Sequence, residues 1–186
     1  LYIVRGIAEL ELLGRTVDDA VGEAYDKVSK FLDLGYPGGP VIEKLALEAK
    51  EKKLRFPKIL ADSHDYRFSY SGIKTAVINY IKQNPDADVP EIAYAFQERA
   101  LEILTRRVFQ AARSLEIKKI VIAGGVAANG RLRKLFSRKK QEDETIIIPS
   151  PVLCTDNAAM IAGLGYHYFN KKIFHDFSLD VYPKIS

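Results

Sequence analysis

The stretch TVDDAVGEAYDKVSKFLDLGYPGG (residues 16–39) sets the expectation for the fold. Thr16 followed three residues later by Asp19 resembles a capping box, so we expect a helix to begin here. Apolar residues then recur at helical spacing and predict one buried stripe: Ala20, Val21, Ala24, Val28 and Phe31. Three carboxylates, those of Asp19, Glu23 and Asp26, project from the opposite side. The acidic side is either a solvated face or part of a site.

The same stretch ends in a turn that contains two adjacent glycines. The helix is expected to stop at Leu34-Gly35, and Tyr36-Pro37-Gly38-Gly39 follows. Glycine has no side chain, so the backbone of this turn can approach another backbone segment or a ligand closely.

Composition places the chain among globular proteins of one domain, or of one domain with an insertion. Of its 186 residues, 47% are hydrophobic and 28% are charged, with a net charge of +4. No apolar run approaches the roughly 18 residues that span a bilayer, so we expect no membrane segment. The single cysteine, Cys154, excludes an internal disulfide and indicates a cytoplasmic location. Because the chain begins with Leu1 rather than Met, we expect further sequence upstream.

Two runs of basic residues raise the question of a nucleic-acid partner. They are KEKKLRFPK at 50–58 and RLRKLFSRKK at 131–140. The second run fits phosphate contacts, and it fits a solvated helix face equally well.

Alternating strands and helices predict an α/β fold. The expected elements are two strands within 1–15, helices at 16–34, 41–53, 73–83 and 90–115, a strand at 119–123, a helix from 132, a strand at 145–148 and a helix from 155. The run at 119–123 is apolar after its first residue, as in a sheet that is covered on both faces. Residues 40–88 are interpreted as a helical insertion.

Three features lie where an α/β sheet places ligands. The first is the acidic helix with Gly38-Gly39, and the second is the turn Gly124-Gly125 with Asn129 at the next helix. The third is Asp156, which either caps a helix or ligates a metal ion. The scattered histidines His64, His167 and His175 are expected at the surface, and Cys154 is expected to be a buried thiol.

Four segments in order and spacing resemble the tRNA N6-adenosine threonylcarbamoyltransferase family. They are LGRTVDDAVGEAYDKVSKFLDLGYPGG, FSYSGIKTAV, IAGGVAANGRLR and CTDNAAMIAGLG. The resemblance implies an actin/Hsp70-like (ASKHA, ribonuclease H-like) fold, with residues 1–39 and 89–186 as its C-terminal lobe and 40–88 as the helical insertion. It also implies an acyltransferase that moves threonylcarbamoyl from threonylcarbamoyl-AMP to N6 of adenosine 37 in ANN-decoding tRNAs.

The resemblance also assigns roles to individual residues. Binding of the adenylate is implied for Asp26, Gly39, Glu43, Gly124, Gly125 and Asn129. Asp156 is implied as a ligand of one divalent metal ion, iron or zinc, and no catalytic side chain is assigned.

The family's HXXXH metal motif and SGGHT phosphate loop do not occur within this chain. We therefore expect the chain by itself to be inactive. The resemblance implies three partners: tRNA, an inactive paralogue and a small ATPase. The alternative is a nucleotide-binding or scaffold module of the same fold without catalysis. A reading frame upstream that carries both motifs would favour the transferase.

Overall fold

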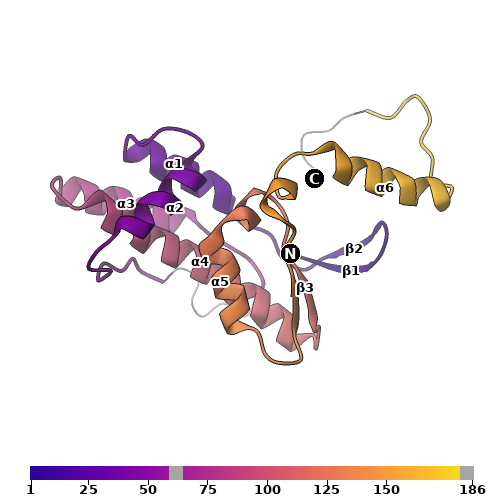
Figure 1. Cartoon of the computed structure of the whole chain (residues 1–186), viewed down its shortest axis with the longest axis horizontal. Coiled ribbons are helices and arrows are strands. Elements are labelled where there is room, and N and C mark those ends of the chain that lie inside the picture. Colours follow the sequence, from indigo (N-terminus) through magenta and orange to yellow (C-terminus); the bar gives the residue numbers. More distant parts are fainter. Residues whose placement is uncertain (59–64, 181–186) are drawn as a thin grey trace.

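The structure, a computed structural model, describes residues 1–58 and 65–180; His64 lies outside them. It combines helices with two small sheets (Figure 1). Its elements in chain order are β1 (Tyr2–Gly6), β2 (Glu9–Leu12), α1 (Val21–Phe31), α2 (Gly38–Glu48), α3 (Ser71–Gln83), α4 (Val89–Ser114), β3 (Lys119–Val121), the 3-10 turn η1 (Gly125–Ala128), α5 (Gly130–Lys139), β4 (Thr145–Ile147), the 3-10 turn η2 (Pro151–Leu153) and α6 (Ala158–Asn170). The mixed α/β class is confirmed.

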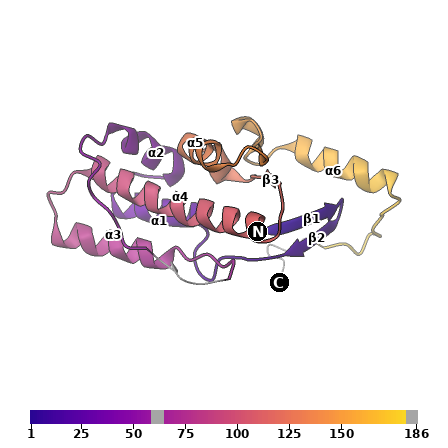
Figure 2. The same cartoon turned by 90° about the horizontal axis from the view of Figure 1, so that it is seen from below.

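Helix α4 forms the centre of the core. It has 26 residues, and its apolar side chains are buried on several sides, among them Ile92, Phe96, Leu101 and Val108. Helices α2 and α3 pack against it, and α1 packs against α2 and α3, as Figure 2 shows. Helices from the segment 40–88 therefore share one core with α1 and α4. The proposed division into lobe and insertion stays a prediction.

The strands form two separate pairs. β1 and β2 make an antiparallel hairpin, and β3 and β4 pair in parallel. The expectation of a sheet covered on both faces is wrong for β3, where Ile120 is buried but Val121 is 60% exposed. Successive strand side chains point to opposite faces, and the core covers only the Ile120 face among the residues that the structure describes.

The start of the first helix also differs from the expectation. Helix α1 begins at Val21, and Thr16 lies in the turn before it. The Thr16 hydroxyl donates to the carbonyl oxygen of Asp19 at 2.8 Å instead of accepting from a helical N–H. At the helix itself, the Ala20 N–H donates to the Glu23 carboxylate at 3.4 Å. Thr16 therefore shapes the entry turn and does not cap the helix.

Helix α6 and the β1–β2 hairpin stand away from the packed helices in both views (Figures 1 and 2). Apolar side chains on both remain exposed, among them Val4, Leu10, Ile161 and Phe169. Within 1–58 and 65–180, no helix is both long enough and apolar enough to cross a membrane.

Candidate functional site

A cavity of about 590 Å³ lies between the two glycine turns of the sequence. Its walls come from α1, the start of α2 and the turn between β3 and α5. The lining residues are Val21, Gly22, Tyr25, Asp26, Pro37, Gly39, Pro40, Glu43, Ala123, Gly124, Gly125, Val126, Ala128, Asn129 and Thr155. All six residues predicted to bind a nucleotide therefore lie on one cavity, although they span about a hundred positions of the chain. Their role in binding stays a prediction.

Asp26 joins α1 to the start of α2. Its Oδ1 accepts a hydrogen bond from the Gly38 N–H at 2.8 Å, and Gly38 is the first residue of α2. A carboxylate at this position satisfies one of the N–H groups that have no partner within the helix. The second oxygen, Oδ2, has no hydrogen-bond partner in the described part of the chain, so it remains available to a ligand in the cavity.

Glu43 joins α2 to the start of α5. Its Oε1 accepts hydrogen bonds from the N–H groups of Gly130 at 2.6 Å and Arg131 at 3.4 Å. Gly130 and Arg131 are the first two residues of α5, so the carboxylate also lies near the positive end of the helix dipole. This contact fixes two walls of the cavity relative to each other.

Both polar atoms of the Asn129 side-chain amide form hydrogen bonds with the protein. Its Oδ1 accepts from the Leu132 N–H at 2.8 Å, which makes Asn129 the N-cap of α5. Its Nδ2 donates to Oε1 of Gln97 on α4 at 2.9 Å. The expectation that Asn129 opens a helix is confirmed. Because the amide is buried and engaged, its main effect on the cavity is to position the Gly124-Gly125 turn.

The two glycines of the first turn serve different purposes. A Cβ on Gly38 would lie 2.5 Å from the Tyr25 carbonyl oxygen and 2.7 Å from the Ser29 Cβ, so glycine is needed for α2 to approach α1. A Cβ on Gly39 or Gly125 would meet nothing within 4 Å. Protein packing therefore does not require glycine at position 39 or 125, and the space beside each of these two glycines is open.

Tyr25 is a lining residue that sequence analysis missed. Its ring packs edge-on against Phe96, with ring centroids 5.0 Å apart, and its hydroxyl is buried with no hydrogen-bond partner in the described residues. Burial, and then the negative charge of Glu43, raise the pKa of this hydroxyl well above its ordinary value. Val21, Tyr25 and Val28 follow helical spacing, so a stripe drawn through them would have included it.

The cavity offers three kinds of surface. Apolar atoms of Val21, Tyr25 and Val126 suit a flat base, and the carboxylates of Asp26 and Glu43 suit hydroxyl or amino donors. The turn at Gly124, where φ is +88°, leads into η1, and successive backbone N–H groups in such a turn favour anions.

Asp156 lies outside this cavity, although its neighbour Thr155 lines it. Of the two alternatives left open for Asp156, a helix cap or a metal ligand, the helix cap is wrong. Asn157 is the N-cap of α6, and its Oδ1 accepts from the Met160 N–H at 3.0 Å. Asp156 is exposed one residue earlier. No group of three histidine, cysteine, aspartate or glutamate residues able to hold a metal occurs within 1–58 and 65–180. These residues alone therefore do not fit a metal site.

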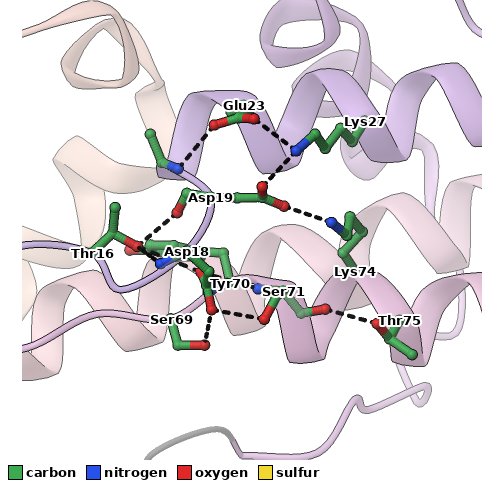
Figure 3. A network of polar contacts seen from close by, with 11 residues as sticks. Thr16, Asp18, Asp19, Glu23, Lys27, Ser69, Tyr70, Ser71, Lys74 and Thr75 are labelled. Carbon is green, nitrogen blue, oxygen red and sulfur yellow. Dashed lines mark hydrogen bonds and ion pairs between the residues drawn. The ribbon is translucent and has the colours of Figure 1, made fainter. Parts of the chain in front are cut away.

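A second polar cluster ties the FSYSG segment to the turn before α1 (Figure 3). The Asp18 carboxylate accepts hydrogen bonds from the Ser69 hydroxyl at 2.5 Å, the Tyr70 N–H at 2.8 Å and the Ser71 hydroxyl at 2.7 Å. Although partial burial raises the pKa of Asp18, these hydrogen bonds outweigh it and hold the pKa below its usual range. Sequence analysis missed Asp18 because its partners lie about fifty residues away.

Asp19 has a structural role in the same cluster. Its carboxylate pairs with Lys27 at 2.5 Å and with Lys74 at 2.8 Å (Figure 3). The hydrogen bonds from these two lysines lower the pKa of Asp19. Of the three carboxylates expected on one acidic face, Asp19 therefore joins α1 to α3, Glu23 pairs with Lys27, and only Asp26 reaches the cavity.

The remaining candidates behave as expected where the structure describes them. Cys154 is buried, and its Sγ lies 3.4 Å from Nη2 of Arg133. His167 and His175 are exposed.

Comparisons with known proteins identify the family. The sequence profile described as "tRNA N6-adenosine threonylcarbamoyltransferase" matches residues 1–163. The protein of that name from Thermosipho africanus is 45% identical to this chain over 188 residues. The match covers 100% of this chain and 57% of the relative. The protein of that name from Treponema denticola is 52% identical to this chain over 174 residues. That match covers 90% of this chain and 51% of the relative. The chain spans about half the length of the curated relatives it matches, and it corresponds roughly to their C-terminal half. The chain belongs to the tRNA N6-adenosine threonylcarbamoyltransferase family.

Proposed function

We propose that this chain supplies the adenylate-binding half of a transferase that modifies tRNA. The substrate would be threonylcarbamoyl-AMP, and the acceptor would be N6 of adenosine 37 in ANN-decoding tRNAs. One observation carries the proposal: the six predicted nucleotide-binding residues line a single cavity in a chain that belongs to this family.

In this proposal Asp26 and Glu43 hold the sugar. Each has one oxygen that accepts a hydrogen bond from a backbone N–H, which fixes its direction, while the second oxygen can accept a hydrogen bond from a hydroxyl group. Half-buried, oriented carboxylates bind neutral donors well and repel phosphate. The phosphate of the adenylate would therefore lie at Gly124 and Gly125, where backbone N–H groups and the start of η1 favour negative charge.

Gly39 and Gly125 make room for the ligand. Neither glycine is forced by a neighbouring protein atom, because a Cβ at either position would enter open space. A bound nucleotide would occupy that space and contact the backbone directly. The apolar atoms of Val21 and Val126 would cover the adenine ring.

Asp156 is proposed as a single ligand of a divalent metal ion, iron or zinc. One exposed carboxylate is too few for firm binding, so further ligands would have to come from outside the described residues. The chain alone would accordingly bind the adenylate without transferring its acyl group. We also propose tRNA, an inactive paralogue and a small ATPase as partners, and a cytoplasmic location.

The test compares binding with transfer. The protein is incubated with threonylcarbamoyl-AMP and an unmodified ANN-decoding tRNA, and threonylcarbamoyladenosine is measured by mass spectrometry of the digested tRNA. The 186-residue chain is expected to bind AMP but to form no product. A protein extended to the length of the relatives is expected to form product, and Asp26→Ala in that protein is expected to weaken binding of the adenylate.

Two outcomes would change the proposed function or its site. An extended protein that binds AMP but never modifies tRNA would favour the alternative, a non-catalytic nucleotide-binding module. Full adenylate affinity in Asp26→Ala would remove Asp26 from the site.

A further inference from the structure

A groove beside α5 brings the two basic runs of the sequence together. It has a volume of about 260 Å³ and lies between the segment after α2 and the last turn of α5, with α4 beneath it. Its charged lining residues are Arg55, Glu98, Arg99, Glu102 and Lys139, and the rings of Phe56 and Tyr94 also line it. Arg55 belongs to the first basic run and Lys139 to the second. Two runs separated by about eighty positions therefore face the same groove.

Two cations of the first run lie over an aromatic ring. The Lys52 Nζ is 5.6 Å and the Arg55 Cζ is 5.9 Å from the centroid of the Tyr94 ring. Nη1 of Arg55 also donates to the carbonyl oxygens of Lys52 at 2.5 Å and Leu54 at 2.7 Å. None of these contacts brings a carboxylate to Arg55, so its positive charge is held in place but is not neutralised.

The acidic residues of the groove are already paired. The Glu98 carboxylate accepts two hydrogen bonds of 2.6 Å from Arg131, and Glu102 pairs with Arg99. Among the described residues, the Lys139 Nζ has a neutral hydrogen-bond partner and no carboxylate, since it donates to the Thr105 hydroxyl at 3.1 Å. The positive charges of the groove therefore exceed the negative ones after every ion pair between described residues is counted.

Further cations extend this surface on both sides. Lys58 and Arg106 line an adjoining depression that shares Arg99 and Glu102 with the groove. Arg138 is exposed in the last turn of α5. We name the following set the basic band: Lys52, Arg55, Lys58, Arg138 and Lys139.

We propose that the basic band binds the phosphate backbone of tRNA, an inference that rests on the proposed function. Helix α5 starts at Gly130, directly after the cavity residue Asn129, and ends at the band, about 15 Å farther along its axis. A polyanion on the band would therefore pass close to the cavity. Cations spaced around an aromatic ring suit nucleic acid, because they meet both the phosphates and an unstacked base.

A structural explanation covers only part of the band. Cations in the last turn of a helix interact favourably with its dipole, which accounts for Arg138 and Lys139. It does not account for Lys52, Arg55 and Lys58, which lie on an irregular segment and have no carboxylate partner within the described parts of the chain.

The test compares a variant that lacks two positive charges of the basic band with a control variant that lacks two positive charges elsewhere on the surface. Arg55→Gln combined with Lys139→Gln is the band variant, because both side chains line the groove. Lys82→Gln combined with Lys172→Gln is the control, because both lysines are exposed on α3 and after α6. Binding of an unmodified ANN-decoding tRNA transcript is measured by fluorescence anisotropy over a series of salt concentrations. The slope of log affinity against log salt is expected to fall by about 2 in the band variant, one for each lost phosphate contact, with roughly tenfold weaker binding at low salt.

The same preparations are titrated with AMP, so that failure of the band and failure of the cavity can be told apart. Loss of tRNA affinity with unchanged AMP affinity in the band variant alone supports the proposal. An equal loss in the control variant, an unchanged salt slope, or a wild-type chain that binds anionic vesicles but not tRNA overturns it. Absence of AMP binding in the wild type would instead count against the proposed function.

Discussion

The Glu43 carboxylate accepts a hydrogen bond from the Gly130 N–H at 2.6 Å and thereby connects α2 to the start of α5. These two residues lie 87 positions apart, and the cavity is bounded by the helices they belong to. The side chain therefore has two consequences, one for the stability of the fold and one for the shape of the cavity.

Replacing Glu43 should affect both. Glu43→Ala leaves two N–H groups at the start of α5 without their acceptor, and we expect a loss of about 1–2 kcal/mol in the free energy of unfolding. Urea denaturation measures this loss. Glu43→Gln keeps a carbonyl acceptor and should lose less, so equal destabilisation by the two variants would contradict the hydrogen-bond explanation.

The adjacent glycines Gly38 and Gly39 provide a matched pair for stability. Gly38→Ala places a Cβ against the Tyr25 carbonyl oxygen, and we expect a loss of about 1–3 kcal/mol from overpacking. Gly39→Ala enters open space within a helix, so its stability should stay equal or rise by up to about 1 kcal/mol. Thermal unfolding followed by circular dichroism distinguishes them, and similar losses in both would refute the packing difference.

The Asp18 carboxylate makes the free energy of unfolding depend on pH. Its pKa in the folded chain lies below the ordinary value of about 4, so its contribution is present above that pH and is lost as the pH falls through the folded pKa. We expect Asp18→Asn to be about 1 kcal/mol less stable at pH 7, a value kept small by solvent screening of this exposed carboxylate. The difference from wild type should shrink below about pH 4. A difference that stays constant from pH 7 to pH 3 would show that Asp18 acts by another route.

Asp156 should matter for metal and not for folding. It is exposed and makes no cap, so Asp156→Ala is expected to change the free energy of unfolding by less than about 0.5 kcal/mol and to leave AMP affinity unchanged. In the extended protein the same substitution should lower metal content, which is measured by elemental analysis. Full metal content in that variant would remove Asp156 from the proposed ligand set.

Six residues of the cavity were predictable because they belong to short continuous segments that carry the family resemblance. The Gly38-Gly39 turn and the GGVAAN turn can each be recognised within a few positions, and the structure places both on one cavity. The position of Asn129 at the start of α5 followed from its place between the glycine turn and the next predicted helix.

Contacts between distant segments were not predictable. Nothing in the sequence near Asp18 indicates that its carboxylate accepts hydrogen bonds from Ser69 and Tyr70, and Thr16 and Asp19 imitate a capping box that the chain does not use. The strand at 119–121 was expected to be covered on both faces, because a short apolar run is typical of such strands. In the structure the exposed side chain of Val121 shows that hydrophobicity alone does not specify burial.

The measurement that tests the central claim most directly is a calorimetric titration of the wild-type chain and of Gly39→Val with AMP. The account predicts that the wild type binds, and that Gly39→Val unfolds at a similar temperature but binds at least about tenfold more weakly, because its side chain fills space meant for the ligand. Equal affinities in the two proteins, or no binding by the wild type, would contradict the assignment of this cavity to an adenine nucleotide.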